Sequence, residues 1–169
     1  MSFVNDILSK FLGNKSQRDM KALMPYIEKI KAVYPQINAL NNDELRERTI
    51  LLKNRVHDAV ADDEKEIQSL KDKVENEDPS IDEREKIYRE IDKLEKEITE
   101  RLEDSLNEVL PEAFSIMKET ARRFNENKTI TVTASEFDRD LAATHDFVEI
   151  DGDKAIYSNS WVAGGNMIV

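Results

Sequence analysis

Apolar positions in the first 57 residues recur at helical spacing and predict three helices. The first stripe is amphipathic, and Gly13 is placed to end its helix; its members are Phe3, Val4, Ile7, Leu8 and Phe11. The second helix should be kinked or opened by Pro25 and ended by Pro35; its stripe is Met20, Leu23, Met24, Ile27, Ile30 and Tyr34. A third helix should begin after Asn41, because Glu44 completes a capping-box pattern three residues later. Its stripe is Leu45, Leu52 and Val56.

Between residues 58 and 105 the chain alternates acidic and basic residues around a thin apolar seam, which predicts an antiparallel helical hairpin. Pro79 should break the helix at the preceding residue, and Ser80 with Glu83 makes a second capping box. The seam consists of Ile67, Leu70 and Val74, then Ile87, Ile91, Leu94, Ile98 and Leu102. Because such a seam buries only a narrow stripe, we expect the hairpin to protrude, to be dispensable to the rest of the fold, and to have residues 56 and 106 near one another.

The last third of the chain changes from helical spacing to strand alternation. Pro111 suits the first turn of a further helix within residues 106–125. Residues 129–133 alternate like a strand, and two later apolar stretches flank residues 151–153 (DGD) as a β-hairpin. The predicted fold is therefore mainly α, with N-terminal helices, a long antiparallel helical hairpin, and a small antiparallel β segment near the C-terminus.

Four units are expected from this pattern. They are an N-terminal helical segment (1–57), an inserted acidic helical hairpin (58–105), a helix leading onward (106–125) and a small β-rich segment (126–169). The apolar residues 167–169 close the chain without a polar end, so we expect the sequence to be truncated there.

Charge is distributed unevenly along these units. The net charge of the 169 residues is −11. Residues 1–56 hold 10 basic and 6 acidic residues, whereas residues 57–105 hold 9 basic and 19 acidic ones. The acidic majority would repel phosphate, which argues against binding of the whole chain to nucleic acid. No apolar run is long enough to cross a bilayer and no secretory signal is visible, so a cytoplasmic protein is expected.

Candidate catalytic chemistry is sparse. The chain has no cysteine, and it has no Gly-x-x-x-x-Gly-Lys-Ser/Thr loop to cradle a triphosphate. His57 and His145 stand outside any metal-ligand spacing, and residues 151–153 lack the other carboxylates of a calcium loop. The many carboxylates between residues 58 and 104 are typical of a solvated helix face. The sequence therefore predicts no catalytic, cofactor-binding or metal-binding residues.

The N-terminal end combines an apolar stripe with an excess of basic residues, which is the pattern of a docking element. The candidate docking residues are Phe3, Ile7, Leu8, Lys10, Phe11, Lys15, Arg18 and Lys21. Two interpretations stay open: the stripe packs on this protein or a partner, or it faces lipid in a membrane interface. Basic residues beside it would favour anionic headgroups.

Two blocks of the sequence resemble the start of the SecA family of preprotein translocase motors. The first block comprises residues 8–13 (LSKFLG), 16–18 (SQR) and 40–49 (LNNDELRERT), and the second is residues 109–123 (VLPEAFSIMKETARR). In that family a short linker joins the blocks, whereas here the acidic hairpin intervenes. After residue 123 the family continues to an adenine-recognition motif and a phosphate loop, whereas this chain has a strand-rich segment.

The resemblance implies that the parent protein is a cytoplasmic ATPase, peripherally associated with the inner face of the cell membrane, that binds Mg-ATP. Its implied partners are the SecYEG channel, preproteins, anionic phospholipids and, as a homodimer, a second copy. This chain would contribute membrane or channel docking and scaffolding, and without the phosphate loop it should be inactive alone. Phe114 and Met117 would be structural residues of a helix packed on the first motor domain.

A competing interpretation is a stand-alone helical-hairpin adaptor. Its basis is the high charge of the hairpin and the lack of catalytic motifs, and its partner would be a basic protein. No sequence motif supports a third interpretation, a hydrolase that uses scattered carboxylates.

Overall fold

The computed structural model describes residues 15–163 and 166–168, with five helices and two small antiparallel sheets among them. The helices are α2 (Lys15–Asn38), α3 (Asn42–Asp58), α4 (Ala61–Asn76), α5 (Ile81–Glu126) and α6 (Glu136–Ala142). The strands are β1 (Thr129–Thr133), β2 (Val148–Asp151), β3 (Lys154–Ser158), β4 (Trp161–Ala163) and β5 (Asn166–Ile168). The predicted fold class is confirmed. The helix predicted over residues 3–11 lies outside the described residues.

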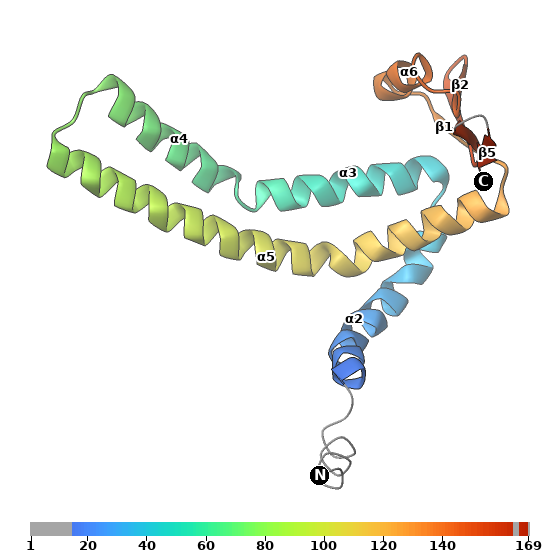
Figure 1. The fold of residues 1–169 in the computed structure, drawn as a ribbon, viewed down its shortest axis with the longest axis horizontal. Coiled ribbons are helices and arrows are strands. Elements are labelled where there is room, and N and C mark those ends of the chain that lie inside the picture. Colours follow the sequence, from blue (N-terminus) through green and yellow to red (C-terminus); the bar gives the residue numbers. More distant parts are fainter. Residues whose placement is uncertain (1–14, 164–165, 169) are drawn as a thin grey trace, which may run out of the picture.

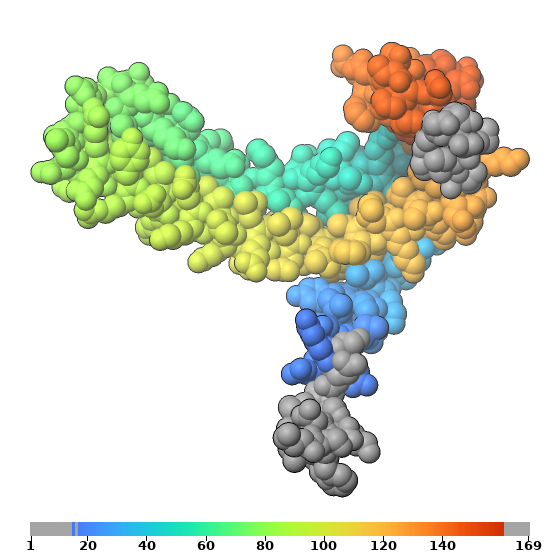
Figure 2. Space-filling view, viewed as in Figure 1, coloured from blue at the N-terminus to red at the C-terminus, as the bar shows by residue number. Residues whose placement is uncertain are grey.

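The molecule is extended rather than spherical. Figure 1 shows α3 and α4 lying end to end along α5, while the first half of α2 points away from the other helices. The small α/β lobe formed by β1, α6, β2 and β3 sits beside the far end of α5. The space-filling view in Figure 2 shows the hairpin, the lobe and α2 as three separate projections. Each projection therefore exposes a large surface.

Helix α2 runs through both of its prolines. Pro25 does not open the helix, because α2 already begins at Lys15, and the prediction that Pro35 ends it is wrong. A proline removes a backbone hydrogen bond and disfavours helix at the residue before it. Packing outweighs this local cost, because Ile37 is only 3% exposed in a cluster with Leu45 on α3 and Ile116 on α5.

The two predicted capping boxes are both present. The Asn41 side chain accepts the backbone N–H of Glu44 at 2.9 Å, and the Glu44 carboxylate accepts the N–H of Asn41 at 2.7 Å. Ser80 and Glu83 make the same reciprocal pair at the start of α5. These bonds satisfy N–H groups that a helix start leaves without partners, which fixes where α3 and α5 begin.

Helices α4 and α5 form the predicted antiparallel hairpin. Its buried centre contains Ile67 from α4 and Ile87, Ile91 and Leu94 from α5, with Leu70, Val74 and Ile98 packed against them. The turn lies at residues 77–80, where Asp78 has a positive φ of 46° and Pro79 prevents α4 from continuing. The seam is thus one residue row wide on each helix, and the remaining positions face solvent.

Helix α5 is a single helix of 46 residues. Its first half belongs to the hairpin, and its second half packs against α2 and α3. We call α3 and the second halves of α2 and α5 the scaffold. The prediction that Pro111 opens a separate helix is wrong, because Pro111 lies inside α5 and is buried. The ring removes the bond to the carbonyl of Asn107, and α5 bends along its length in Figure 1. Burial of Ser115 and Ile116 one turn later holds the helix together across this position.

The C-terminal lobe contains the predicted strands and one helix that was not predicted. The sheet order is β1-β3-β2, with both pairs antiparallel. Asp151 pairs with Lys154, so the hairpin turn is Gly152-Asp153, and only Gly152 takes a positive φ (60°). Val132, Val148 and Ala155 form the core of the lobe, and α6 covers it through Leu141.

Candidate functional site

The exposed end of α2 carries the described part of the predicted docking residues. Lys15, Arg18 and Lys21 are all exposed, whereas Phe3, Ile7, Leu8, Lys10 and Phe11 lie outside the described residues. Met20, Leu23 and Met24 on the same stretch are 58%, 54% and 43% exposed. At 100° per residue the three apolar side chains share one face, and the three basic ones lie away from it. The start of α2 is therefore an amphipathic surface whose apolar side chains are about half exposed.

The second half of α2 is clamped to α5 through a buried carboxylate. Glu119 on α5 is fully buried and accepts hydrogen bonds from both helices. The donors are the Tyr34 hydroxyl at 2.9 Å, the Asn38 amide at 3.0 Å, Arg122 at 2.7 and 3.0 Å, and Arg123 Nε at 2.7 Å. A buried charge is tolerated when it is paired and fully hydrogen-bonded, as it is here.

Electrostatics keep this junction ionised at neutral pH. The hydrogen bond from Arg122 lowers the pKa of Glu119 well below its ordinary value, and the bonds from Asn38, Arg123 and Tyr34 add to this against the opposing effect of burial. The bond to Glu119 in turn raises the pKa of Arg122 and that of Tyr34. The junction is thus a fixed ion cluster rather than a proton donor or acceptor near pH 7.

Arg123 extends this junction to the start of α3. Its Nη1 donates to Asn42 Oδ1 at 2.7 Å, and its Nη2 donates to the backbone oxygen of Leu40 at 2.5 Å. Asn42 then donates its amide to the backbone oxygen of Thr131 on β1 at 3.0 Å. One arginine therefore links α5, the α2–α3 turn and, through Asn42, the small lobe.

A second buried carboxylate holds the lobe to α3. Asp138 on α6 is fully buried and receives both terminal nitrogens of Arg46, at 2.8 and 2.9 Å. The backbone N–H and hydroxyl of Ser135 donate to it at 2.7 Å each, and the Tyr157 hydroxyl also donates to it. Asp43 on α3 adds bonds to the N–H and hydroxyl of Thr133, at 2.7 and 2.9 Å.

The same bonds set the ionisation of this second junction. Burial acts to raise the pKa of Asp138, but the hydrogen bonds from Arg46, Tyr157 and Ser135 outweigh it and lower that pKa. Burial and the bond to Asp138 raise the pKa of Tyr157 to about 12. Asp138 is therefore a charged anchor, and Tyr157 stays protonated under ordinary conditions.

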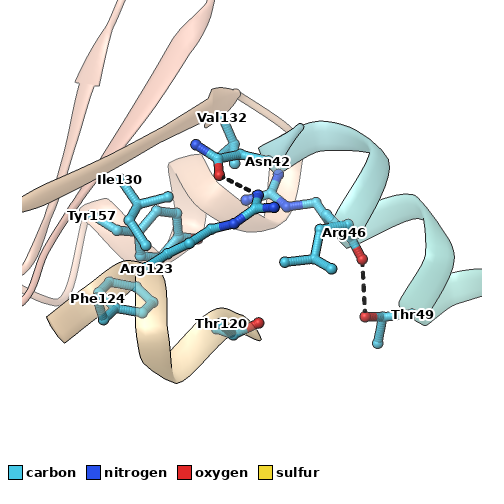
Figure 3. Close-up of a pocket in the computed structure, with 10 residues that line it drawn as sticks. Asn42, Arg46, Thr49, Thr120, Arg123, Phe124, Ile130, Val132 and Tyr157 are labelled. Carbon is cyan, nitrogen blue, oxygen red and sulfur yellow. Dashed lines mark hydrogen bonds between the residues drawn. The ribbon is translucent and has the colours of Figure 1, made fainter. Parts of the chain in front are cut away.

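A pocket of about 220 Å³ lies where α3, the end of α5 and the sheet meet. Figure 3 shows Phe124, Ile130, Val132 and Tyr157 around it, with Arg123 reaching across to Asn42. Arg46 and Arg123 border the pocket, but both guanidinium groups already bind carboxylates. The pocket thus offers an apolar surface and two neutralised cations, which is not the donor set of a phosphate site.

An apolar groove of about 660 Å³ runs between α3 and α5. On one side the helices are joined by the ion pairs of Arg48 with Glu112 and of Arg55 with Glu108. The groove itself is lined mainly by apolar side chains of the two helices and of the turn after α3. They include Leu52, Val56, Val60, Leu102, Leu106, Val109, Ile116 and Met117. Val56 and Leu106 both line this groove, and Arg55 beside the one pairs with Glu108 beside the other at 2.6 Å, so the two ends of the hairpin lie near one another.

The remaining candidates form no site in the described part of the chain. The side chain of His57 is largely exposed beside Asp58, and His145 packs edge-on against Phe147. No cluster of three or more metal-ligating side chains occurs among the described residues. Within those same residues no helix is both long and apolar enough to cross a bilayer.

Sequence reasoning missed both buried carboxylates. Glu119 is one of 36 acidic residues, and its partners on α2 lie 81 and 85 positions away, so no local pattern marks it. Asp138 was detectable, because Ser135 and Asp138 have capping-box spacing and do form that motif at the start of α6.

Fold and site together define a helical scaffold region that is clamped by two buried ion clusters and carries three projecting elements. Comparison with known families identifies it further: the model of the SecA DEAD-like domain matches residues 8–144. The chain belongs to the SecA family. The family match covers the hairpin of α4 and α5 as well as the two sequence blocks that resemble the family.

Individual relatives agree with this assignment. The chain is 54% identical over 164 residues to the protein translocase subunit SecA of Parabacteroides distasonis, covering 97% of this chain and 14% of that protein. The corresponding subunits of Porphyromonas gingivalis and Flavobacterium psychrophilum are 53% and 48% identical, over 98% and 99% of this chain and 15% of each relative. The chain thus spans about one seventh of the length of these relatives. No solved structure matches it.

Proposed function

We propose that this chain is the N-terminal region of a SecA protein translocase subunit and that it supplies docking and scaffolding rather than ATP hydrolysis. Family membership and the names of its relatives support the translocase role. The parent protein would be a cytoplasmic, peripherally membrane-bound motor that uses Mg-ATP to move preproteins through the SecYEG channel. The phosphate loop absent from this sequence would be supplied by another part of that protein.

The observation that carries the docking role is the exposed amphipathic start of α2. Lys15, Arg18 and Lys21 lie within two turns of one another on a helix end that projects from the scaffold (Figure 1). Each basic residue near an anionic leaflet contributes about 1 kcal/mol of attraction, so this end should bind anionic lipid weakly and reversibly. The apolar residues Phe3, Ile7, Leu8 and Phe11, with Lys10 among them, would add the part that enters the interface.

The test is binding to vesicles of phosphatidylglycerol and phosphatidylcholine, or of phosphatidylcholine alone, measured by co-sedimentation. The full chain should bind only the anionic vesicles and should be released as salt rises through the screening range. Changing Lys15, Arg18 and Lys21 together to Gln should weaken binding about a hundredfold.

A matched control changes Lys71, Lys86 and Lys96 to Gln, which alters the net charge equally on the exposed hairpin. This variant should keep its binding if the α2 end is the docking site. Equal binding to both kinds of vesicle, or equal losses in the two variants, would reject the proposal.

A further inference from the structure

One side of α5, in its scaffold half, carries large apolar side chains that are exposed. Leu106, Phe114 and Met117 are 53%, 57% and 72% exposed. Together with the partly exposed Leu110 they follow one another at intervals of four, four and three residues, which places them on one side of the helix. We call these four residues the α5 face. An exposed apolar surface of this kind is typical of an interaction site.

The neighbouring helices leave the α5 face open. Helix α2 packs on another side of α5, where Ser115 and Glu119 bond to residues of α2. At about 100° per residue, that side lies about 165° around the helix from the α5 face. Helix α3 reaches only one edge of the face, where Leu106 and Met117 line the groove between α3 and α5. The α5 face is therefore accessible to a partner.

The apolar pattern is symmetric about Leu110. One large apolar side chain lies four residues before it, at Leu106, and another lies four residues after it, at Phe114. In a contact between two identical copies, a two-fold axis pairs each position with the one at the same distance on the other side of the axis. With the axis at Leu110, Leu106 of one copy packs on Phe114 of the other. A partner of different sequence would require no such symmetry.

The two ends of the α5 face carry charges of opposite sign. Glu103 lies seven residues before Leu110 and Lys118 lies eight residues after it, and both are exposed. Within the described part of the chain neither side chain forms an ion pair, although the Lys118 ammonium lies 4.1 Å from the centre of the Tyr34 ring. In an antiparallel pair of α5 helices, Glu103 of each copy lies beside Lys118 of the other. Charge complementarity therefore favours a second copy in this orientation.

We propose that two copies of this chain associate through the α5 face, with the two helices antiparallel and the two-fold axis at Leu110. This goes beyond the proposed function, because it concerns the association of two scaffolds and does not involve the basic end of α2. A face about 17 Å long and one helix wide is small beside the roughly 800 Å² that each partner buries in a stable interface. The association is therefore weak, with a dissociation constant on the order of 100 µM.

Sedimentation equilibrium of the full chain measures this association. The average mass should rise from that of a monomer to that of a dimer as the concentration passes through the dissociation constant. Leu106→Glu should weaken the association at least about tenfold, because it places a charge in the apolar contact at a position exposed in the single chain. Tyr88→Glu is the matched control, since Tyr88 is equally exposed, at 53%, in the hairpin half of α5. A chain that stays monomeric up to about 1 mM, or equal losses in the two variants, would overturn the proposal.

Single cysteines locate the axis, because the sequence has no cysteine of its own. Under mild oxidation Leu110→Cys should give disulfide-linked dimers, since only position 110 meets its own copy within the roughly 7 Å that a disulfide spans. Leu106→Cys and Phe114→Cys should each form few dimers alone, whereas an equal mixture of the two should form the mixed disulfide at least about tenfold faster. Tyr88→Cys gives the rate of random collision.

Two results of the cross-linking would overturn the proposed arrangement. A rate for Leu110→Cys no higher than that for Tyr88→Cys would mean that no axis lies at Leu110. Cross-linking of Leu106→Cys alone at the rate of the mixture would mean that the helices are parallel.

The charges at the ends of the α5 face give an independent test. Glu103→Lys places a like charge beside Lys118 of the other copy at both ends of the contact, so the dissociation constant should rise about fivefold or more. Glu90→Lys changes the net charge equally at an exposed position of the hairpin, and it should leave the dissociation constant within about twofold of its original value. Equal effects of the two variants would mean that Glu103 and Lys118 do not meet, which rejects the antiparallel arrangement.

Discussion

Tyr34 on α2 donates its hydroxyl to the fully buried carboxylate of Glu119 on α5, across 2.9 Å and 85 positions of sequence. The same carboxylate binds Arg123, which in turn holds the start of α3. Three helices therefore depend on one charged side chain. The apolar cluster around Ile37 and Ile116 lies beside this junction, so polar and apolar contacts hold α2 at the same place.

Removing the charge of Glu119 should destabilise the scaffold strongly. In Glu119→Gln the guanidinium groups of Arg122 and Arg123 lose their buried counter-ion, and losses of this kind are about 3 kcal/mol. Urea unfolding followed by circular dichroism measures the change. The control is Glu126→Gln, because Glu126 pairs with Arg122 at an exposed position where a pair contributes about 0.5 kcal/mol or less. Similar losses in the two variants would contradict the central role of Glu119.

The lowered pKa of Glu119 predicts that acid weakens the junction. A carboxylate whose folded pKa is depressed stabilises the fold above its unfolded pKa, here 4.5, and that stabilisation is lost as pH falls toward the folded pKa. Between pH 6 and pH 3 the unmodified chain should therefore lose about 2 kcal/mol more than Glu119→Gln, at 1.4 kcal/mol per pH unit below 4.5. Urea unfolding of both proteins across this range gives the difference. Parallel pH curves would show that Glu119 is not held ionised by its partners.

The bidentate pair of Arg46 and Asp138 should control how firmly the small lobe is held. In Arg46→Met, Asp138 keeps its bonds from Ser135 and Tyr157 but loses its counter-ion, so the contact between α3 and the lobe weakens. Amide hydrogen exchange in β1 and β3 should speed up about tenfold, while exchange in α5 should not change. Arg55→Met is the control, since the pair with Glu108 is exposed on both sides. Unchanged exchange in the lobe would mean that apolar contacts hold it.

Local patterns predicted the elements that local bonds determine. The starts of α3 and α5 were predictable because Asn41 and Ser80 bond to backbone groups three residues away. The helix boundaries predicted at Pro35 and Pro111 were wrong because contacts distant in sequence determine them. Burial of Ile37 and Ile116 outweighs the local cost of a proline inside a helix, which is about 3 kcal/mol. That packing joins residues far apart in sequence, which no periodicity reveals.

The candidate site was predictable to a similar degree. Helical spacing marked the basic and apolar residues at the start of α2, but it did not show that Met20 and Leu23 would be exposed while Ile37 is buried. The apolar side chains of α2 are exposed in its first half and buried in its second half, because only the second half packs against α5. Only the arrangement of α2 on α5 makes this distinction.

The chain alone should neither bind nor hydrolyse Mg-ATP. Its sequence lacks the glycine-rich loop whose N–H groups hold the phosphates, and the arginines beside the pocket near Phe124 are engaged by carboxylates. Calorimetric titration with Mg-ATP should give only heats of dilution, and phosphate release should equal that of buffer. Saturable binding in the micromolar range would show that the chain holds a nucleotide site of another kind.

The hairpin of α4 and α5 should be removable without unfolding the rest. Its seam forms an apolar cluster of its own, and Asp63 pairs with Arg101 at 2.7 Å beyond the scaffold end of that cluster. Replacing residues 64–100 by a short Gly/Ser linker keeps that pair and keeps buried Val60 in the α3–α5 groove. Because loop-closure entropy changes slowly with length, the free energy of unfolding should stay within about 1 kcal/mol of its original value.

Thermal melts followed by circular dichroism measure this, with Ile116→Ala as a reference for real damage to the scaffold core. Ile116 is 7% exposed, so truncating it should cost about 2 to 4 kcal/mol and lower the melting temperature clearly. The deletion variant should instead melt in one cooperative transition close to that of the full chain. A broad, non-cooperative melt of the deletion variant would mean that α5 stays helical through Pro111 only when its first half is present. The hairpin would then be part of the scaffold and could not be removed from it.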